Sequence, residues 1–463
     1  MKRTRLTSWL LFAGVLLLVA GIGLSESFLA QWRQLGGPNA QGKLTVNVDL
    51  AADPTGSAGL TIREAEKLAE KWGRPVHYSA RAPAVATAGD TETEADAIGV
   101  GGSYDRFANV WLYRGGMITE KSIEEHSRVV MVSSGLAEQL FRTRDVVGMK
   151  LQLMGATFTV IGVYEQAESL LHRMTDNGKP DLLLPITTLI DLNASVKVAT
   201  IELEAGPNAA ISGETDVRSA LSAIGKPPSR YRIVNLAAER SWVGQKPTLL
   251  LAAAGAAGLV LCARLAALRI GRAVRLIRRG LSVEDWPDVV KRYRRELSVD
   301  AAALLALSAC AVLLWLSIRY RFYIPAELVP EEWIDGSFYR DKLLEWWRSE
   351  VAAMGYVAST SELLYAKVGL LVDRLTLVGF LVGLPLVWIG VREWAMVGLA
   401  PDRRIVRLAV YACGAVVLTA AIAALTGAEY AIRPRELFVV ASLLGLAALS
   451  APSPQTTFIR KKG

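Results

Sequence analysis

Two stretches decide how this chain is organised: residues 9–24 read WLLFAGVLLLVAGIGL, and residues 247–268 read PTLLLAAAGAAGLVLCARLAAL. Each comes close to the length of about 20 apolar helical residues that crosses a hydrocarbon core roughly 30 Å thick. Residues 26–246 lie between them and contain no comparable run. The pattern predicts a folded domain held outside a membrane between the first two crossings of the chain.

The second half of the 463-residue chain carries four further apolar runs, and 52% of all residues are hydrophobic. These runs are too long for buried strands or core helices. We therefore expect an α-helical integral membrane protein of about six transmembrane helices, with an α+β extracytoplasmic domain inserted between the first and second. The predicted segments are helix 1 at 1–25, the extracytoplasmic domain at 26–246, helix 2 at 247–268, a basic cytoplasmic segment at 269–299, helix 3 at 300–318, an outer aromatic loop at 319–368, helix 4 at 369–391, a cytoplasmic loop at 392–407, helix 5 at 408–426 and helix 6 at 436–452.

The net charge of +8 is concentrated beside the ends of the apolar runs, which favours a membrane surface over nucleic acid as the partner. Residues 264–295 hold ten Lys and Arg residues against three acids. The other clusters are Lys2, Arg3 and Arg5; Arg392, Arg403, Arg404 and Arg407; and Arg460, Lys461 and Lys462. All four fall on one side of a six-helix topology. We therefore expect a multi-pass protein of the cytoplasmic membrane with both termini in the cytoplasm.

The first apolar run has an alternative interpretation as a cleaved signal peptide, because it follows a basic start and leads to small residues at 21–25. A retained anchor is favoured, since the run is longer than a usual signal core. Both interpretations place residues 26–246 outside the cytoplasm.

The sequence offers little for catalysis, metals or cofactors. Cys262, Cys310 and Cys413 all lie in predicted helices, so the outer domain cannot depend on disulfides, and the three histidines are widely separated. No GxxxxGK[ST], GxSxG, HExxH or SxxK motif occurs. We expect no enzyme activity in this chain, no cofactor and no metal site.

The outer domain shows mixed strand and helix patterns. Residues 42–49, 76–81 and 95–100 read as strands, and the polar stretch 83–94 reads as a loop. Thr61 begins a capping-box pattern, TIRE, ahead of a helix of about a dozen residues.

The most specific stretch is residues 129–163. It predicts a strand at 129–133, a short helix capped by Ser134, and then a hairpin. The hairpin strands are residues 151–153 and 158–163, with the turn placed at Gly155-Ala156 because glycine supplies the necessary backbone freedom.

These residues resemble the periplasmic core domain of MacB/FtsX-type ABC transporter permeases. The resemblance rests on VVMVSSGLAEQLF at 129–141, on Val147-Gly148 through Gly162-Val163, and on IGVGGSY at 98–104, GGMIT at 115–119 and DLLLP at 181–185, all in family order. It covers roughly residues 40–245 and implies a permease-like subunit that works with a separate cytoplasmic ATP-binding subunit. The familiar MacB arrangement has four transmembrane helices, whereas six are expected here.

The loop between predicted helices 4 and 5 resembles the family's cytoplasmic helix and turn that dock on the ATPase. Arg392-Glu393 stands at its start, Gly398 in the turn and Arg403 at the opening of the next helix. The resemblance implies that Arg392, Glu393, Gly398 and Arg403 couple this chain to the ATPase. A basic loop that only sets the topology is the simpler alternative for the arginines.

Two other segments have membrane-surface patterns. Arg269, Arg272 and Arg275 recur at helical spacing, which suits an anionic inner leaflet or simply sets the topology. The outer loop is rich in Trp and Tyr, which suit the headgroup level, and an amphipathic helix is expected over 337–354, in contact with the outer domain.

The leading hypothesis is therefore a mechanotransmission permease subunit of an ABC transporter, in export or envelope processes, acting as a homodimer or heterodimer of permeases in the lipid bilayer. The alternative is a non-transporting membrane scaffold or sensor whose outer domain binds a protein or envelope ligand. An extracytoplasmic protein partner fits either hypothesis, and nucleic acid fits neither.

Overall fold

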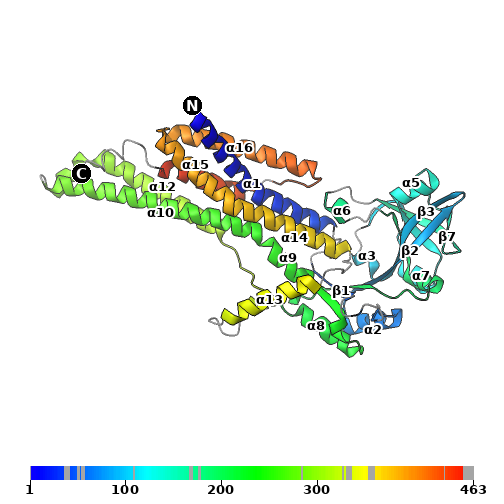
Figure 1. The fold of residues 1–463 in the computed structure, drawn as a ribbon. Helices are drawn as coiled ribbons and strands as arrows, with labels where there is room; N and C mark the ends of the chain where they lie inside the picture. The colour runs from blue at the N-terminus through cyan, green and yellow to red at the C-terminus, as the bar shows by residue number, and fades with distance from the viewer. Residues whose placement is uncertain are drawn as a thin grey trace. The chain divides into compact units, whose positions relative to one another are not determined.

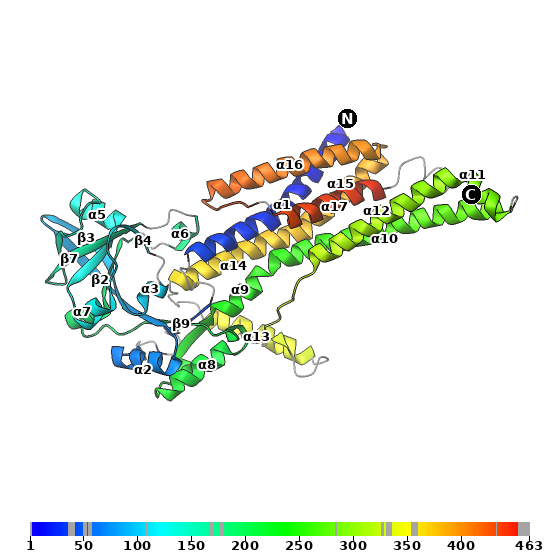
Figure 2. The same ribbon diagram turned by 180° about the vertical axis from the view of Figure 1, so that it is seen from behind.

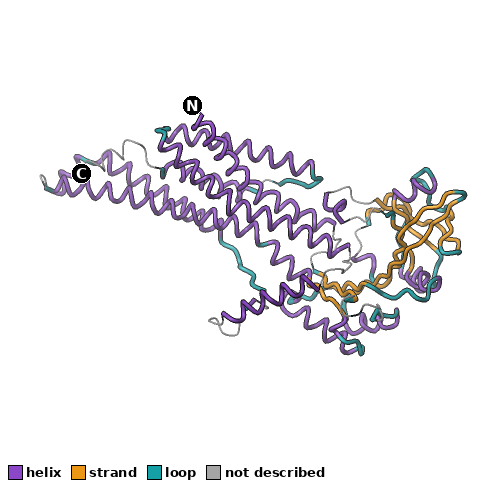
Figure 3. The backbone as a smooth tube through the Cα atoms, in the orientation of Figure 1, coloured by secondary structure: helices purple, strands orange, loops and turns teal. Residues whose placement is uncertain are grey.

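The structure is a computed structural model in which two compact units can be described separately. The helical unit comprises Met1–Leu29, Gly244–Phe322 and Gly369–Gly463, and the sheet unit comprises Ala30–Val243 and Tyr323–Val368. All described strands lie in the sheet unit (Figure 3). The residues described are 2–35, 42–49, 53, 58–107, 110–165, 170–175, 179–282, 285–325, 328–329, 336–352, 360–431 and 433–451.

The sheet unit is built around ten described strands. They are β1 (Lys43–Val48), β2 (Val76–Ala88), β3 (Thr91–Gly102), β4 (Trp111–Gly115), β5 (Val129–Ser133), β6 (Lys150–Leu153), β7 (Ala156–Glu165), β8 (Asp181–Pro185), β9 (Thr200–Glu204) and β10 (Tyr231–Asn235). Their order is β10-β1-β9-β2-β3-β8-β5-β7-β4, and β6 pairs with both β2 and β7. The pairings therefore close β2, β3, β8, β5, β7 and β6 into a ring, while β9, β1 and β10 extend from the other part of β2.

Helices surround these strands. They are α2 (Ile62–Trp72), α3 (Tyr104–Phe107), α4 (Glu120–Glu124), α5 (Ser134–Phe141), α6 (Leu170–Thr175), α7 (Ile186–Leu192), α8 (Ala209–Ala223), the 3-10 turn Pro228–Arg230, α9 (Leu236–Gly244) and α13 (Gly336–Ala352). Figure 1 shows α5 and α7 on the part of the sheet unit that holds β3 and β7, and α2 and α8 near β1. The expected α+β character is what the structure shows.

The capping-box prediction is confirmed. Thr61 precedes α2, its hydroxyl accepts from the Glu64 backbone N–H at 3.3 Å, and Glu64 Oε2 accepts from the Thr61 N–H at 2.9 Å. Two otherwise unpaired backbone donors are thereby satisfied. Ala65 and Leu68 on the inner face are fully buried, which joins the helix to the core.

The predicted hairpin is present, with its turn one residue earlier than expected. β6 and β7 are joined by Met154 and Gly155, whose φ angles are 49° and 78°, and Ala156 already belongs to β7. Two positive φ angles characterise the type I′ turn, whose twist matches antiparallel strands. The short helix α5 is likewise capped one residue earlier, since the Ser133 hydroxyl, not that of Ser134, accepts from the Leu136 N–H.

The prediction of a loop at residues 83–94 is wrong. These residues complete β2 and β3, which pair in one continuous antiparallel register from His77↔Gly102 to Ala88↔Thr91. Alanines alternating with polar residues form a weak strand signal, but small side chains fit the inside of the ring: Ala82, Ala86 and Ala95 are each at most 2% exposed. The two-residue turn at Gly89-Asp90 uses a glycine with φ 59°.

The outer aromatic segment belongs to the sheet unit from Tyr323 on, whereas the expected contact of its amphipathic helix with the outer domain stays a prediction. The Tyr323 hydroxyl donates to the Ala210 carbonyl at 3.0 Å, and the Tyr365 hydroxyl bonds to Glu239. Between them α13 forms close to the expected bounds of 337–354. Tyr339, Leu343 and Trp347 of α13 are all more than half exposed.

The helical unit is formed by α1 (Lys2–Leu35), α10 (Lys246–Leu281), α11 (Trp286–Arg292), α12 (Arg294–Ile318), α14 (Thr360–Val378), the π-helical turn Gly379–Gly383, α15 (Leu384–Met396), α16 (Pro401–Leu425) and α17 (Pro434–Ser450). α17 packs against α10, α12, α15 and α16, and Figure 2 shows it among them. In the described part of the chain, the helices long and apolar enough to cross a membrane are Leu6–Gln34, Leu236–Leu281, Arg294–Ile318, Leu363–Met396 and Pro401–Leu425. They overlap the first five predicted spans, whose bounds stay predictions, whereas α17, at 17 residues, falls short of that length, so a sixth span also stays a prediction.

Glycines let α1 approach α14, the π-helical turn and α15 closely. A Cβ on Gly21 would lie 2.9 Å from the Leu375 carbonyl oxygen, and one on Gly14 would lie 2.9 Å from the Val387 nitrogen. Gly379 and Gly383 face α1 from the other side. Small residues four apart allow this backbone-to-backbone packing of membrane helices, where dispersion replaces the hydrophobic effect.

We predict that residues 40–245 fold when expressed alone, because the ring and the strands beside it share a continuous buried core that contains no cysteine. Circular dichroism should show mixed helix and strand content with a cooperative thermal transition. The Phe158→Ala variant should lose about 3–5 kcal/mol of unfolding free energy, since Phe158 is fully buried. An insoluble or disordered wild-type fragment would contradict the assignment.

Acidification should destabilise this fragment. Burial lowers the pKa of His77, whose Nδ1 lies 2.8 Å from the Gly101 carbonyl oxygen. Burial would raise the pKa of Glu202, but Lys43, at 2.7 Å, and His77 outweigh it and hold that pKa below its usual value. Because both pKa values are depressed in the folded state, the two groups contribute stability at pH values above their unfolded-state pKa values, which are about 6.5 for histidine and 4.3 for glutamate. That contribution is lost as the pH falls from these values through the lower folded-state pKa values.

The melting temperature of the fragment should therefore fall between pH 7.5 and 5, and fall further below pH 4.5. His77→Phe cannot take up a proton, so its profile should be flatter between pH 7.5 and 5.5. At pH 7.5 the variant should lose about 1–3 kcal/mol, because the Gly101 carbonyl loses its side-chain partner. Equal pH slopes for the two proteins would refute the role given to His77.

Candidate functional site

The four residues predicted to couple to an ATPase surround the connection between α15 and α16. Arg392 and Glu393 lie in the last turns of α15, Gly398 lies in the connection, and Arg403 lies in the first turn of α16. Arg392, Gly398 and Arg403 are exposed, and Glu393 is half-buried. No described interaction links the three charged side chains to one another, so they form one accessible surface and no charge cluster.

Gly398 ends helix α15. Its φ is 83°, and its N–H donates to the Ala395 carbonyl at 3.1 Å, while the Leu399 N–H donates to the Trp394 carbonyl at 3.1 Å. This pair of bonds is the Schellman motif, which ends a helix with a left-handed residue. Gly398 therefore fixes where α15 stops and where the chain turns toward α16.

The residue that anchors this connection is Arg404, which the sequence reasoning grouped with the topology-setting arginines. It is fully buried: Nε donates to the Leu399 carbonyl at 2.6 Å, and Nη1 donates to the carbonyls of Ala448 at 3.2 Å and Ala451 at 3.0 Å. The last two carbonyls belong to the C-terminal end of α17. Arg404 thus joins the connection to α17 with charge-assisted hydrogen bonds.

The spacing of the buried residues along α16 is a sequence pattern that could have identified Arg404 as buried. The buried positions of α16 are Arg404, Leu408, Ala415, Thr419 and Ala423. They recur at intervals that keep one face of an α-helix. Arg403 lies about 100° away around the helix and is exposed, so two adjacent arginines of similar appearance have opposite environments.

Aromatic residues bind the start of α1 to the same connection. Trp394 is 2% exposed, its ring centroid lies 5.8 Å from that of Tyr411, and the Arg407 guanidinium carbon lies 5.7 Å above the indole. Tyr411 in turn lies 5.6 Å from Phe12 of α1. Trp394 therefore provides the packing centre between α15, α16 and α1.

Arg392 also faces α10. It lines a cavity of about 270 Å³ together with Arg264 of α10 and Trp388 of α15, floored by Ser450 and Ala451 at the end of α17. No acidic residue is among the lining residues. Together with the contacts of Arg404 and Arg407, this cavity brings the basic ends of α10, α15 and α16 to one end of the helical unit.

The opposite end of the unit carries paired charges. Arg433 lies 2.9 Å from Glu26, and Lys246 forms an ion pair with Asp373. The second pair joins α14 to the start of α10. Arg319, Arg321, Arg374 and Arg435 also lie near this end, so the orientation drawn from the charge pattern stays a prediction; residues 460–462 lie outside the described part.

The basic segment after predicted helix 2 forms a helical hairpin. α10 has 36 residues, hence a length of about 54 Å, which exceeds a hydrocarbon core of roughly 30 Å. Asp300 of α12 is 1% exposed and accepts from Arg269 at 3.0 Å, with Arg272 at 3.8 Å. Two of the three arginines expected to face lipid thus hold α10 and α12 together.

No cluster of three or more His, Cys, Asp or Glu side chains suited to a metal ion occurs among the residues described. His77 is a buried core residue, and His126 pairs with Asp191 at the surface at 2.5 Å. The third histidine, His172, lies in α6.

Arg404 should be necessary for a stable helical unit. Arg404→Met retains the length but removes the donors, leaving one buried and two partly buried carbonyls without their partner, and hydrogen bonds to charged groups are worth about 1.5–3 kcal/mol each. The apparent melting temperature of the detergent-solubilised protein should fall by several degrees. Arg403→Met, the matched exposed control, should change it little. Equal melting temperatures for the two variants would remove the anchoring role.

Comparison with known proteins supports the resemblance drawn from the sequence. Residues 6–218 match the family model of the MacB-like periplasmic core domain. That part of the chain, which includes most of the sheet unit, thus carries a domain of this family. No curated protein matches the chain significantly.

Several solved structures are similar to this chain. The periplasmic region of MacB from Actinobacillus actinomycetemcomitans has 17% identity and a TM-score of 0.37, covering 45% of this chain and 94% of that one. The extracellular domain of the noncanonic ABC-type transporter YknZ from Gram-positive bacteria has 18% identity and a TM-score of 0.35, covering 42% and 100%. A domain of a putative permease protein from Porphyromonas gingivalis has 15% identity and a TM-score of 0.27, covering 42% and 85%.

Proposed function

We propose that this protein is a permease-like subunit of an ABC transporter that transmits mechanical force to its extracytoplasmic domain, in export or envelope processes. The observation that carries the proposal is the family match over residues 6–218, on a chain with several helices apolar enough to span a membrane. In such a protein ATP hydrolysis moves the helices, and the helices move the outer domain. Passage of a substrate between the helices is not required.

The ATPase is a separate cytoplasmic subunit in this proposal, because the sequence contains no GxxxxGK[ST] phosphate-binding loop. The basic end of the helical unit is the cytoplasmic end, in accord with the positive-inside rule. Both termini are then cytoplasmic. The sheet unit faces the outside, where an extracytoplasmic protein partner would bind, and two permease chains act as a homodimer or heterodimer.

The connection between α15 and α16 is the proposed docking surface. Arg392, Glu393 and Arg403 offer charged groups for contact, and Gly398 sets the turn that presents them. A load on this surface passes directly into the helices, since Arg404 bonds it to α17. The turn between α10 and α12 is a second surface at the same basic end. Here Val289 of α11 is fully buried, and a Cβ on Gly280 of α10 would lie 2.5 Å from a Val289 methyl group.

Co-purification tests the proposal. Full-length wild-type protein, extracted from the native membrane in mild detergent, should retain an ATP-binding protein that mass spectrometry identifies. Arg392→Ala/Glu393→Ala should deplete that protein at least severalfold, because two of the three charged groups of the docking surface are lost. The two substitutions remove no described hydrogen bond or ion pair, so the melting temperature should stay close to that of wild type.

Arg340→Ala/Asp341→Ala is the matched control. It also removes one arginine and one neighbouring acid, joined at 3.0 Å on the exposed face of α13 in the sheet unit. This control should retain the ATP-binding protein. Absence of any ATPase from well-folded wild type would favour the scaffold or sensor function. Equal retention of the ATPase by all three proteins would exclude the connection between α15 and α16 as the docking surface and would favour the turn between α10 and α12.

A further inference from the structure

A second cavity lies at the basic end of the helical unit, between α1 and α16. It has a volume of about 580 Å³ and is lined by Ser8, Trp9, Phe12, Arg407, Val410, Tyr411 and Gly414. None of these seven residues is among the predicted coupling residues. The cavity contains one cation and no acid, and most of its wall is aromatic or aliphatic.

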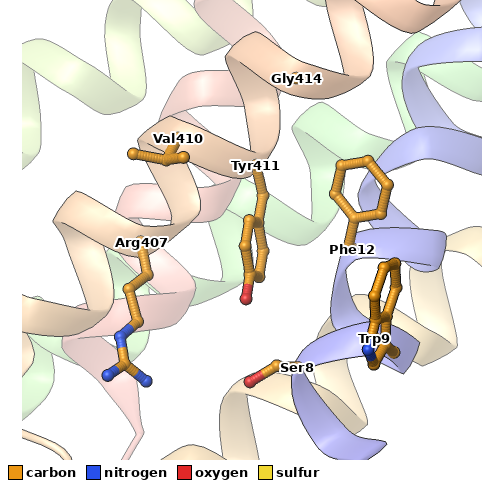
Figure 4. Close-up of a pocket in the computed structure, with 7 residues that line it drawn as sticks. All are labelled: Ser8, Trp9, Phe12, Arg407, Val410, Tyr411 and Gly414. Atoms are coloured by element: carbon orange, nitrogen blue, oxygen red, sulfur yellow. The ribbon is translucent and has the colours of Figure 1, made fainter. Parts of the chain in front are cut away.

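Polarity in this cavity changes with position along the helices. Figure 4 shows the Arg407 guanidinium and the hydroxyls of Ser8 and Tyr411 directed toward one side, with Phe12 and Gly414 toward the other. Arg407 and Gly414 are seven residues apart on α16, hence about 10 Å along its axis. The cavity therefore has a cationic end near the helix termini and an apolar end deeper in the unit.

We infer that this cavity binds one anionic phospholipid from the inner leaflet, with its phosphate at Arg407 and an acyl chain along Phe12, Val410 and Gly414. An inorganic anion would use only the cationic end and leave the apolar wall uncovered. A neutral amphiphile would leave the guanidinium without a counter-ion, since no described acidic side chain pairs with it. A ligand with both a phosphate and a hydrocarbon chain complements the whole surface.

The surroundings supply such a ligand. Trp9 is 68% exposed and Val410 is 62% exposed, so the mouth of the cavity opens on the surface that a transmembrane helix presents to lipid. Lys2, Arg3 and Arg5 precede Ser8 on the same helix and raise the local concentration of anionic headgroups. Basic pockets between membrane helices on the cytoplasmic side are recurrent sites for anionic lipid headgroups.

Arg407 can bind a phosphate without leaving its present position. Its guanidinium carbon lies 5.7 Å from the centre of the Trp394 ring, and no described hydrogen bond or ion pair uses its five N–H donors. A bidentate hydrogen bond to phosphate uses two of them. The bound lipid would then touch the packing centre formed by Trp394 and Tyr411.

The site requires open space beside Gly414. A Cβ at this position would meet only Phe12, at 3.5 Å, which is an ordinary contact. A leucine side chain would extend into the apolar end and occupy the place of the acyl chain. Gly414→Leu therefore blocks the tail, and Arg407→Gln removes the charge that holds the headgroup, so two independent changes address the same ligand.

The test is native mass spectrometry of the full-length protein titrated with phosphatidylglycerol or phosphatidylcholine in detergent. Wild type should retain one phosphatidylglycerol per chain in preference to phosphatidylcholine. Arg407→Gln should weaken phosphatidylglycerol binding on the order of tenfold, as expected for the loss of a charge-assisted contact. Gly414→Leu should abolish it while leaving Arg407 in place.

Two controls match these variants. Arg275→Gln removes an exposed arginine of α10, and Gly445→Leu enlarges a glycine of α17 that has no neighbour within 4 Å. Both should retain the lipid, and circular dichroism should confirm equal helix content in all five proteins. Because none of these substitutions alters the proposed docking residues, ATPase co-purification reports separately on the proposed function.

Other results would overturn the inference. Equal binding of both lipids, unchanged in Arg407→Gln, would mean that the cavity holds any apolar chain. Displacement of phosphatidylglycerol by equimolar inorganic phosphate would identify an anion site without a lipid tail. A lipid retained by Gly414→Leu and by Arg407→Gln alike would place it elsewhere, and a cross-link from Gly414→Cys to a second copy would make the cavity a dimer contact.

Discussion

The helical unit depends on one buried cation. Arg404 satisfies three backbone carbonyls, two of them at the end of α17, where a helix leaves its carbonyls without internal partners. A positive charge at the C-terminal end of a helix is also favoured by the helix dipole. Because α17 packs against α10, α12, α15 and α16, the position of one guanidinium is linked to most of the unit.

This arrangement separates structural charges from available ones. Arg404, Arg269 and Arg272 bond within the unit, whereas Arg264, Arg392 and Arg403 make no described ion pair. The basic end is therefore not a uniform patch that only sets topology. Buried Arg404 fixes the end of α17, Arg269 and Arg272 hold α10 to α12, and the arginines without an ion pair, with Arg407, remain available to a protein surface or to lipid phosphates.

The sequence predicts those features that local physics determines. The α2 capping box, the hairpin of β6 and β7 and the apolar runs of the first five spans all depend on neighbours in the chain. The long β2–β3 hairpin was missed because its alanines gain their preference for strand only inside the closed ring. Arg404 was not distinguished from Arg403, since its partners Ala448 and Ala451 lie more than forty residues away.

The β2 strand has a consequence for how motion crosses the sheet unit. Its residues 76–79 pair with β9, its residues 86–87 pair with β6, and β3 accompanies it along its whole length. Extended over 13 residues, it measures about 43 Å. One uninterrupted covalent path thus runs from the open strands into the ring, with no linker between them. A rotation applied at β9 is therefore passed to the ring, which follows as a rigid body. The domain is suited to transmit rotation and is poorly suited to a hinge closure between its open strands and its ring.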